Sequence, residues 1–349
     1  MHAALPTSPS SPAAGTPMLS TRFSQGLMGH PLLRPLAALA LLLLIDLCFI
    51  PGFFRLEIKD SHLYGSVIDI LNRAAPLMLA ALGMTLVIAT RGIDVSVGAV
   101  VAISGTLAAL LVSSHASLAL ALAAGMGAAL LCGTWNGALV AGLGLQPIIA
   151  TLILMVAGRG LAQLLTDGQI ITVYDPPFFY LGGGYLLGLP VALFVVTAMF
   201  SLTAWLMRKT ALGLFIQAVG INPVASRLAG IRTAALIFFV YVFCSACAGL
   251  AGLLIASNIK SADANNAGLL LELDAILAVT LGGGSLAGGK FSLAGSFIGA
   301  LIIQTLTYTI YALGVPPEVN MVVKASVVFV VCLSQSAEFK QLWRRLGSR

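Results

Sequence analysis

Long runs of apolar residues, separated by short polar stretches, follow one another along most of the chain. Many runs reach roughly 17–25 residues, the length that an α-helix needs to cross about 30 Å of hydrocarbon. Their apolar residues do not alternate with a period of two, so the pattern favours helices over the strands of a membrane barrel. We therefore predict an all-α membrane protein with about ten transmembrane helices, some of them short or broken. The expected spans are residues 33–50, 73–90, 94–113, 116–141, 147–165, 189–207, 234–256, 270–284, 292–312 and 319–335.

The composition fits a chain embedded in a membrane. Of the 349 residues, 59% are hydrophobic and only 9% are charged, whereas a soluble domain carries about 25% charged residues. The mean hydropathy is +1.03. A water-exposed fold cannot hide so much apolar surface, so we expect the bilayer to be the solvent for most of the chain.

Lysine and arginine are divided unevenly between the two sides of the predicted spans. If the N-terminus lies inside, the cytoplasmic segments hold Arg22, Arg34, Arg91, Arg208, Lys209, Arg227, Arg232, Lys290, Lys340, Arg344, Arg345 and Arg349. The external loops then hold only Arg55, Lys59, Arg73 and Lys260. Because cytoplasmic loops carry an excess of positive residues, we expect both termini in the cytoplasm. The net charge of +6 reflects this bias rather than a nucleic-acid surface.

Three stretches are expected along the chain. Residues 1–31 include LPTSPSSPAAGTP, a composition typical of a disordered Ser/Pro-rich cytoplasmic tail. Residues 32–336 form a polytopic membrane domain, whose largest cytoplasmic loop is 208–233. Residues 337–349 form a basic cytoplasmic tail. We expect no cleavable signal, because the first apolar run reads better as an anchoring helix.

A glycine-rich stretch, GGGSLAGGKF from Gly282 to Phe291, has almost the spacing of a phosphate-binding loop. Phe291 stands where such a loop needs Ser or Thr to hold magnesium, and no soluble nucleotide domain surrounds it. We therefore predict a tight cytoplasmic turn between two membrane helices instead of an ATP site, because glycine permits sharp turns and close helix approach. The residues assigned to this turn are Gly282, Gly283, Gly284, Gly288, Gly289 and Lys290.

Within loop 208–233, the segment NPVASRLAG carries the signals of a short helix. Asn222 suits the N-cap, Pro223 the first helical position and Gly230 the position after the end. A helix of about two turns is expected outside the membrane. It is either a helix resting on the membrane surface or a docking helix for a cytosolic partner.

Four segments together resemble the membrane permease of ribose-type ABC sugar importers, over roughly residues 35–335. They are TRGIDVSVGAVVAISG (90–105), LQPIIATLILMVAGRGLAQ (145–163), TALGLFIQAVGINPVASRLAGI (210–231) and LELDAILAVTLGGGSLAGGKF (271–291). DILNRAAP (69–76) and SADANNAGLLLELDAILAV (261–279) resemble more narrowly the galactofuranose-type permeases. The chain departs from the family at Arg91, where the usual motif TGGIDLSVG has glycine.

This resemblance implies a multi-pass permease of the bacterial inner membrane that moves a sugar from the periplasm to the cytoplasm. The implied partners are a cytosolic ATP-binding cassette subunit, a periplasmic sugar-binding protein and a second permease subunit, either the same or a related chain. The galactofuranose-type resemblance implies a related chain. The residues that would couple to the ATPase are Asn222, Pro223, Ser226, Arg227 and Gly230.

Polar residues in or beside the predicted spans gather toward the external side, where they suggest a path for the sugar. The candidates are Asn72, Arg73, Trp135, Asn136, Arg159, Asn265, Asn266, Glu272, Asp274 and Asn320. Two uses are compatible with the pattern: a salt-bridge network, with Arg159 bound to Glu272 or Asp274, or a polar entrance that binds sugar hydroxyls. Trp135 and Asn136 fit either helix packing or sugar stacking.

No catalytic chemistry is expected from the sequence. The histidines His2, His30, His62 and His115 are scattered, and no metal spacing, cofactor motif or nucleophile with a base is present. Cys244 and Cys247 lie within an apolar span, so we interpret them as small packing residues. The alternative function is a secondary transporter driven by an ion gradient. It would use buried carboxylates, for which the candidates are Asp46, Asp94 and Asp274.

Overall fold

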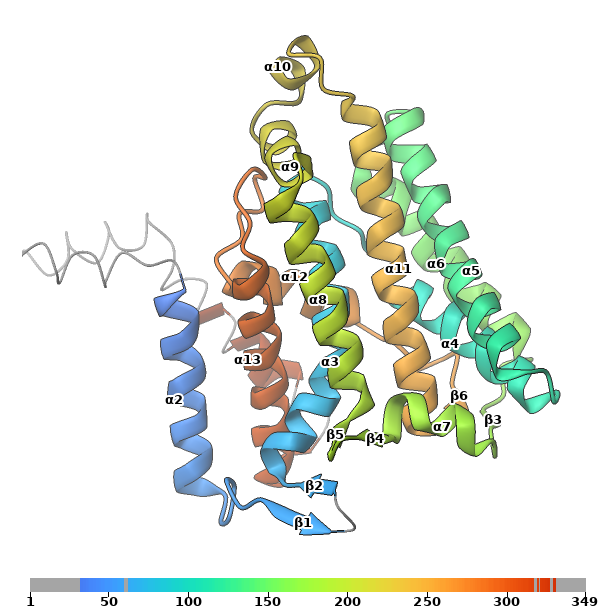
Figure 1. Cartoon of the computed structure of the whole chain (residues 1–349), viewed down its shortest axis with the longest axis vertical. Helices are drawn as coiled ribbons and strands as arrows, with labels where there is room; N and C mark the ends of the chain where they lie inside the picture. Colours follow the sequence, from blue (N-terminus) through green and yellow to red (C-terminus); the bar gives the residue numbers. More distant parts are fainter. Residues whose placement is uncertain (1–31, 60–61, 317–318, 320, 327–328, 331–349) are drawn as a thin grey trace, which may run out of the picture.

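The computed structural model describes residues 32–59, 62–316, 319, 321–326 and 329–330. Its main feature is a bundle of helices (Figure 1). The helices are α2 (Leu33–Phe49), α3 (Ser66–Ala89), α4 (Val97–Ser113), α5 (Leu118–Gly137), α6 (Pro147–Leu165), α7 (Pro176–Gly183), α8 (Val191–Lys209), α9 (Leu212–Ile221), α10 (Pro223–Leu228), α11 (Thr233–Ile259), α12 (Leu271–Leu281) and α13 (Leu293–Ala312). A π-helical turn, η1 (Ala138–Gly142), continues α5.

Three two-stranded antiparallel ribbons join the helices. They pair β1 (Glu57–Lys59) with β2 (His62–Tyr64), β3 (Ile171–Thr172) with β6 (Ser261–Ala262), and β4 (Tyr185–Leu186) with β5 (Leu189–Pro190). All three lie with α7 at one end of the bundle, which we call the hairpin end (Figure 1). Helices α9 and α10 lie at the opposite end, which we call the α10 end.

Six helices of the described chain are long and apolar enough to cross a membrane. They are α3, α5 with its η1 extension, α6, α8, α11 and α13. Helices α2 and α4 have 17 residues each, and α12 has 11. The helical class is therefore confirmed, while the count of about ten spans and the cytoplasmic termini stay predictions. Most of the span predicted at 319–335, and both predicted tails, fall outside the described residues.

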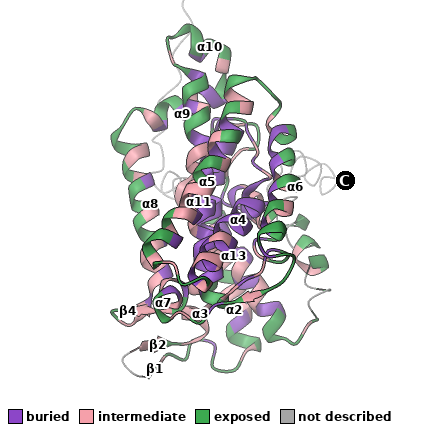
Figure 2. Ribbon diagram, turned by 90° about the vertical axis from the view of Figure 1, so that its right-hand side faces the viewer, coloured by how far each residue is buried: buried purple, intermediate pink, exposed green. Residues whose placement is uncertain are grey.

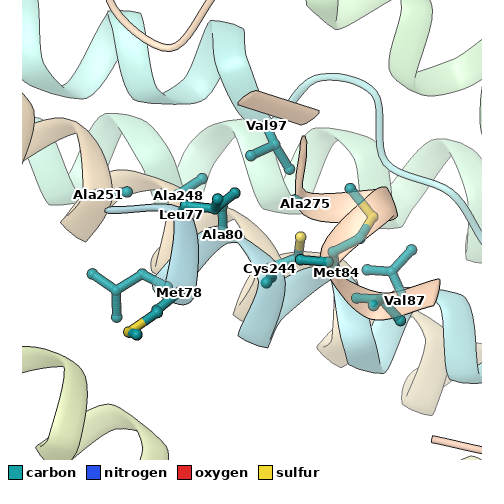
Figure 3. Close-up of a cluster of buried hydrophobic side chains, with 14 of the residues drawn as sticks. Leu77, Met78, Ala80, Met84, Val87, Val97, Cys244, Ala248, Ala251 and Ala275 are labelled. Atoms are coloured by element: carbon teal, nitrogen blue, oxygen red, sulfur yellow. The ribbon is translucent and has the colours of Figure 1, made fainter. Parts of the chain in front are cut away.

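The core of the bundle forms around α3 and α11. In α3, 78% of the most apolar window is buried, against 22% in α8. Buried residues gather at the centre of the molecule, whereas α10 is mostly exposed (Figure 2). Small residues let these helices approach closely: a Cβ at Gly83 of α3 would lie 2.8 Å from the Cα of Cys244. Cys244 and Cys247 are fully buried, and Cys244 belongs to the central cluster of apolar side chains, which agrees with a packing role (Figure 3).

Two helices begin inside the bundle instead of at its surface. Helix α4 follows an irregular segment that contains the fully buried Asp94. Helix α12 follows the loop 263–270, and the two N-termini meet where Gly98 lies against Gly268 and the Glu272 carboxylate. Irregular backbone at membrane depth is tolerated where protein surrounds it. The short and broken helices expected from the sequence are therefore present.

Candidate functional sites at the two ends of the bundle

Helix α10 is a separate capped helix, as the sequence predicts. Asn222 is extended, and its Oδ1 accepts hydrogen bonds from the backbone N–H groups of Val224 and Ala225, both at 3.0 Å. Pro223 is the first helical residue. Ser226 is buried, but the side chains around it are not: Val224 is 69% and Leu228 is 85% exposed, and Arg227 is exposed. The helix thus presents apolar and cationic side chains outward, and Gly230 follows it with a φ of +86°.

The base of α10 is tied to two other connections of the bundle. We call this contact the α10 joint and define it by residues 89–91, 220–221 and 288–289. Arg91 Nε donates to the carbonyl of Gly220, and Arg91 Nη2 donates to that of Ile221, each at 2.5 Å. The backbone N–H of Gly289 donates to the carbonyl of Ala89 at 2.9 Å. The last residues of α9 are therefore held by the loop after α3 and by the glycine turn.

The glycine turn lacks the setting of a phosphate-binding loop. Helix α12 precedes it, whereas such a loop follows a strand. Gly282 packs directly against the backbone of Gly295, so the ends of α12 and α13 touch. Gly288 and Gly289 have φ angles of +84° and +80°, and Gly283 and Lys290 are exposed. The segment is a tight connection between two helices.

A cavity of about 290 Å³ lies at the hairpin end, between α3, α7, α8, α11 and α13. Its polar lining residues are Asn72, Arg73, Asn258, Gln304, Thr307 and Tyr311. Its apolar wall includes Pro76, Leu254 and Ile255. A few polar groups within an apolar wall are typical of small-molecule sites. We call this space the α3–α11 cavity.

Several polar atoms of the α3–α11 cavity have unused hydrogen-bonding capacity. Asn72 Oδ1 is buried and has no partner within the described chain. Asn258 Nδ2 donates to the Gly182 carbonyl at 3.0 Å, which leaves its Oδ1 free. The Gln304 amide makes no hydrogen bond to any described residue. The Arg73 side chain is 64% exposed, and its Nε binds Asp69 at 2.8 Å. The free groups are therefore neutral amides and the two Nη groups of Arg73.

A second hollow, of about 310 Å³, adjoins this cavity and shares Asn72 with it. Tyrosines Tyr64, Tyr185 and Tyr308 line it. The rings of Tyr64 and Tyr185 have centroids 5.3 Å apart, and Tyr308 Oη donates to Ser66 Oγ at 2.8 Å. The second hollow leads from the β-ribbons to Asn72, so an aromatic vestibule lies beside the amide-lined cavity.

Arg159 does not pair with Glu272 or Asp274, so that prediction is wrong. Its Nη1 donates to the carbonyls of Ala264 and Ala267, at 3.1 and 2.7 Å. The loop before α12 places two of its carbonyls at the guanidinium. The positions of charged residues in the sequence do not indicate such a contact with the backbone. Arg159 therefore orders the loop 263–270.

The same loop holds two asparagines of the predicted path. Asn265 accepts a hydrogen bond from Gln163 Nε2 at 2.9 Å, and Asn266 Nδ2 donates to Asp263 Oδ2 at 3.0 Å. Both asparagines are exposed and lie outside the α3–α11 cavity lining. The candidate path residues thus do not form one group.

Asp274 forms an ion pair with Lys324, whose Nζ lies 2.9 Å from Asp274 Oδ2. Both side chains are about one-fifth exposed, at 23% and 20%. The sequence analysis had proposed Arg159 as a partner of Asp274 instead. Asn320 lies outside the described residues.

Trp135 and Asn136 face different surroundings. The Trp135 side chain is 53% exposed, whereas Asn136 is fully buried and donates to Ser96 Oγ at 2.8 Å. Asp94 Oδ1 accepts hydrogen bonds from both the N–H and the Oγ of Ser96, at 2.9 and 2.6 Å. Asp94 and Asn136 therefore hold the turn before α4. A joint stacking site of Trp135 with Asn136 is absent from this arrangement.

Comparison with known proteins shows which family the chain belongs to. Residues 66–332 match the family model described as branched-chain amino acid transport system, permease component. The chain belongs to this permease family. It is 52% identical to the galactofuranose transporter permease protein YtfT of Escherichia coli K12, over 90% of this chain and 92% of the relative.

Two further relatives are sugar import permeases by name. Identity is 39% to the fructose import permease protein FruF of Bifidobacterium longum NCC 2705, over 92% of each chain. It is 36% to the ribose import permease protein RbsC of Escherichia coli K12, over 86% of this chain and 92% of the relative. The predicted resemblance to ribose-type and galactofuranose-type permeases is confirmed. The chain is a multi-pass inner-membrane protein of a transporter family. No solved structure matches it.

The cavity residues Asn258, Gln304 and Thr307 escaped the sequence reasoning. Each is an isolated polar residue within a strongly apolar span, which by itself indicates only a helix contact. The available signal was that the predicted topology places them, like Asn72, in the outer half of the membrane. Using it requires knowing that α3, α11 and α13 are neighbours.

Proposed function

We propose that this chain is the transmembrane subunit of an ATP-binding cassette importer. It moves a monosaccharide from the periplasm to the cytoplasm by alternating access, driven by a separate ATPase subunit. Galactofuranose is the first candidate substrate, because the relative with 52% identity is named for that sugar. The proposed partners are the ATPase, a periplasmic sugar-binding protein and a second permease subunit.

One observation carries the coupling part of this proposal. The exposed side chains of α10 include two apolar residues, Val224 and Leu228, next to a cation, Arg227. Exposed apolar side chains on a rigid, capped helix are typical of an interaction site. The α10 joint would pass a displacement of this helix to α3, α12 and α13. Residues 208–233 are therefore proposed as the coupling loop, and Asn222, Pro223, Ser226, Arg227 and Gly230 as its functional positions.

The proposed topology places the α10 end in the cytoplasm and the hairpin end in the periplasm. About ten spans, including the shorter α2, α4 and α12, would then cross or enter the bilayer. Residues 1–31 and 337–349 would be cytoplasmic tails. The distribution of lysine and arginine supports this orientation, because Arg208, Arg227 and Arg232 all belong to the α10 end.

An ion-gradient mechanism finds less support. Asp46 accepts a hydrogen bond from Thr309 at 2.6 Å, Asp94 binds Ser96, and Asp274 pairs with Lys324. The three carboxylates are thus held by three separate sets of contacts. A gradient-driven carrier needs a carboxylate at the shared ion and substrate site.

The test is copurification and uptake with an Arg227→Glu variant. The wild-type chain, isolated in mild detergent from its native membrane, should retain a stoichiometric ATPase subunit. Arg227→Glu should lose most of that subunit and abolish uptake, while still inserting in the membrane. Arg55→Glu, a charge reversal at the exposed hairpin end, is the matched control and should retain both. Uptake that persists without an ATPase and collapses with an uncoupler would overturn the proposal.

A further inference from the structure

The α3–α11 cavity offers neutral hydrogen-bonding groups that the protein itself leaves free. Asn72 lines the cavity, and its Nδ2 makes no hydrogen bond to any described residue. Its Oδ1 is shielded from solvent and also has no partner in the described chain, which costs free energy. The Gln304 amide and Asn258 Oδ1 add a donor and two acceptors to the same lining. The polar groups therefore border one half-open cavity.

The charge of the residues that line the cavity indicates which class of solute it can bind. A zwitterionic amino acid needs both an anionic and a cationic partner when it leaves water. The only charged residue of the cavity lining is Arg73, whose Nε binds Asp69 at 2.8 Å, so the lining holds no anionic partner for an ammonium group. A neutral polyol needs amides and hydroxyls, which both donate and accept hydrogen bonds. The lining thus favours an uncharged, hydroxyl-rich solute.

The shape of the site fits a compact ring. The volume of about 290 Å³ is at the small end of ligand pockets. Pro76 and Leu254 lie one helical turn from Asn72 and Asn258, and together with Ile255 they give the cavity an apolar surface beside the amides. The adjoining vestibule, with Tyr64 and Tyr185, gives the cavity an aromatic approach from the hairpin end.

We propose that the α3–α11 cavity is the permease's own binding site for a neutral monosaccharide, held by Asn72, Asn258 and Gln304. This inference rests on the proposed importer function. The sugar would enter through the tyrosine vestibule and exchange hydrogen bonds with water for hydrogen bonds with these amides. Since the bonds are few and uncharged, binding is weak and release toward the opposite end is easy.

The direct test is protection of an engineered cysteine in whole cells. Gln304→Cys places a thiol in the cavity, and Tyr174→Cys places one on an 85% exposed loop residue as the control. Both are labelled with a membrane-impermeant thiol reagent, with or without D-galactose, D-fructose, D-ribose or L-leucine at 100 mM, a concentration on the order of that required for weak binding. Wild-type labelling measures the background from the native cysteines.

At least one sugar should slow labelling of Gln304→Cys about threefold or more, while leucine should have no effect. Tyr174→Cys should label at the same rate in every condition. Protection by leucine alone would overturn the assignment to sugars. Equal labelling rates in all conditions, in cells that import one of these sugars, would overturn the cavity assignment.

Uptake kinetics provide the second measurement. In the full complex, Gln304→Leu should raise the KM for the transported sugar about tenfold, since two hydrogen bonds are lost. The ATPase subunit should copurify as in the wild type. Gln169→Leu, the same substitution at an exposed loop position, should leave the KM unchanged.

Two kinds of failure are distinguishable. A wild-type complex that imports sugar, with an unchanged KM in Gln304→Leu and no protection, rejects only the cavity assignment. A wild-type chain that binds no ATPase and imports none of the three sugars rejects the importer function itself.

Discussion

At the α10 joint the contacting groups are mainly backbone, whereas at the α3–α11 cavity they are side chains with unused hydrogen-bonding atoms. A Cβ at Gly220 would clash with the Ala89 carbonyl oxygen and would lie 2.4 Å from the Gly289 nitrogen, so no side chain fits there. The cavity, in contrast, leaves room of about 290 Å³. Close backbone packing transmits displacement because it cannot be compressed, while spare amides can change partners. The two ends therefore suit mechanical coupling and reversible binding respectively.

The largest effect is expected from breaking the joint itself. Gly220→Ala forces the Ala89 carbonyl or the glycine turn to move, so we expect a destabilisation of about 1–3 kcal/mol. The thermal unfolding midpoint in detergent should fall by about 5 °C or more, and uptake should be lost. Gly160→Ala is the matched control, because Gly160 is also helical and a Cβ added there would meet no atom within 4 Å. Equal midpoints for the two variants would contradict the role of the joint.

A smaller effect is expected from Arg91, the residue that departs from the family motif. Its guanidinium holds Gly220 and Ile221, but its backbone has a φ of 65°, which costs about 1–2 kcal/mol for a residue other than glycine. Arg91→Gln should lose the bonds and keep the strain, whereas Arg91→Gly loses both. We therefore expect Arg91→Gly to unfold about 2–4 °C above Arg91→Gln, which a thermal scan of both variants measures.

The amount of sugar imported for each ATP hydrolysed should be lower in these two variants than in the wild type. Both lack the bonds to α9, so both should import less sugar for each ATP hydrolysed, by a similar factor. If Arg91→Gly imports as efficiently as the wild type, the guanidinium contributes no coupling and only the backbone contacts of the joint matter.

The two regions also differ in how far the sequence predicted them. Asn222, Pro223 and Gly230 specify α10 through local rules, since a cap, a first-turn proline and a terminating glycine act within a few residues. The apolar runs likewise predicted α2, α6 and α13 to within a few residues. One part of the α10 joint was predicted: the sequence indicated a glycine turn at this position. Its neighbourhood with Arg91 was not predicted.

The cavity could not be predicted in the same way. Asn72, Asn258 and Gln304 are far apart in the sequence, and only the packing of α3, α11 and α13 brings them together. The Arg159 prediction failed for a related reason. The prediction paired the arginine with carboxylates, but two backbone carbonyls of the loop before α12 accept its hydrogen bonds instead. Local signals predict elements, whereas sites between elements depend on tertiary contacts.

The smallest effect on stability is expected from the exposed ion pair between Lys59 and Glu57, which makes no hydrogen bond to the backbone of another described element. In the β1–β2 ribbon, Lys59 Nζ lies 2.8 Å from Glu57 Oε2, and both side chains are well exposed. Lys59 lowers the pKa of Glu57, chiefly by donating a hydrogen bond and also by its charge. A lowered carboxyl pKa contributes stability above the unfolded pKa of about 4.3 and loses it as the pH falls through the folded value. Solvent and salt screen the exposed pair, so this contribution is minor.

We therefore expect Lys59→Gln to leave the thermal midpoint unchanged at pH 7. Wild type and variant should also lose stability in parallel between about pH 5 and pH 3, the window around the carboxyl pKa. Thermal scans of both proteins at low ionic strength check this. A fall at pH 7 as large as that of Arg91→Gln would contradict the comparison. It would mean that an ion pair in water stabilises the hairpin end as strongly as the Arg91 guanidinium stabilises the α10 joint.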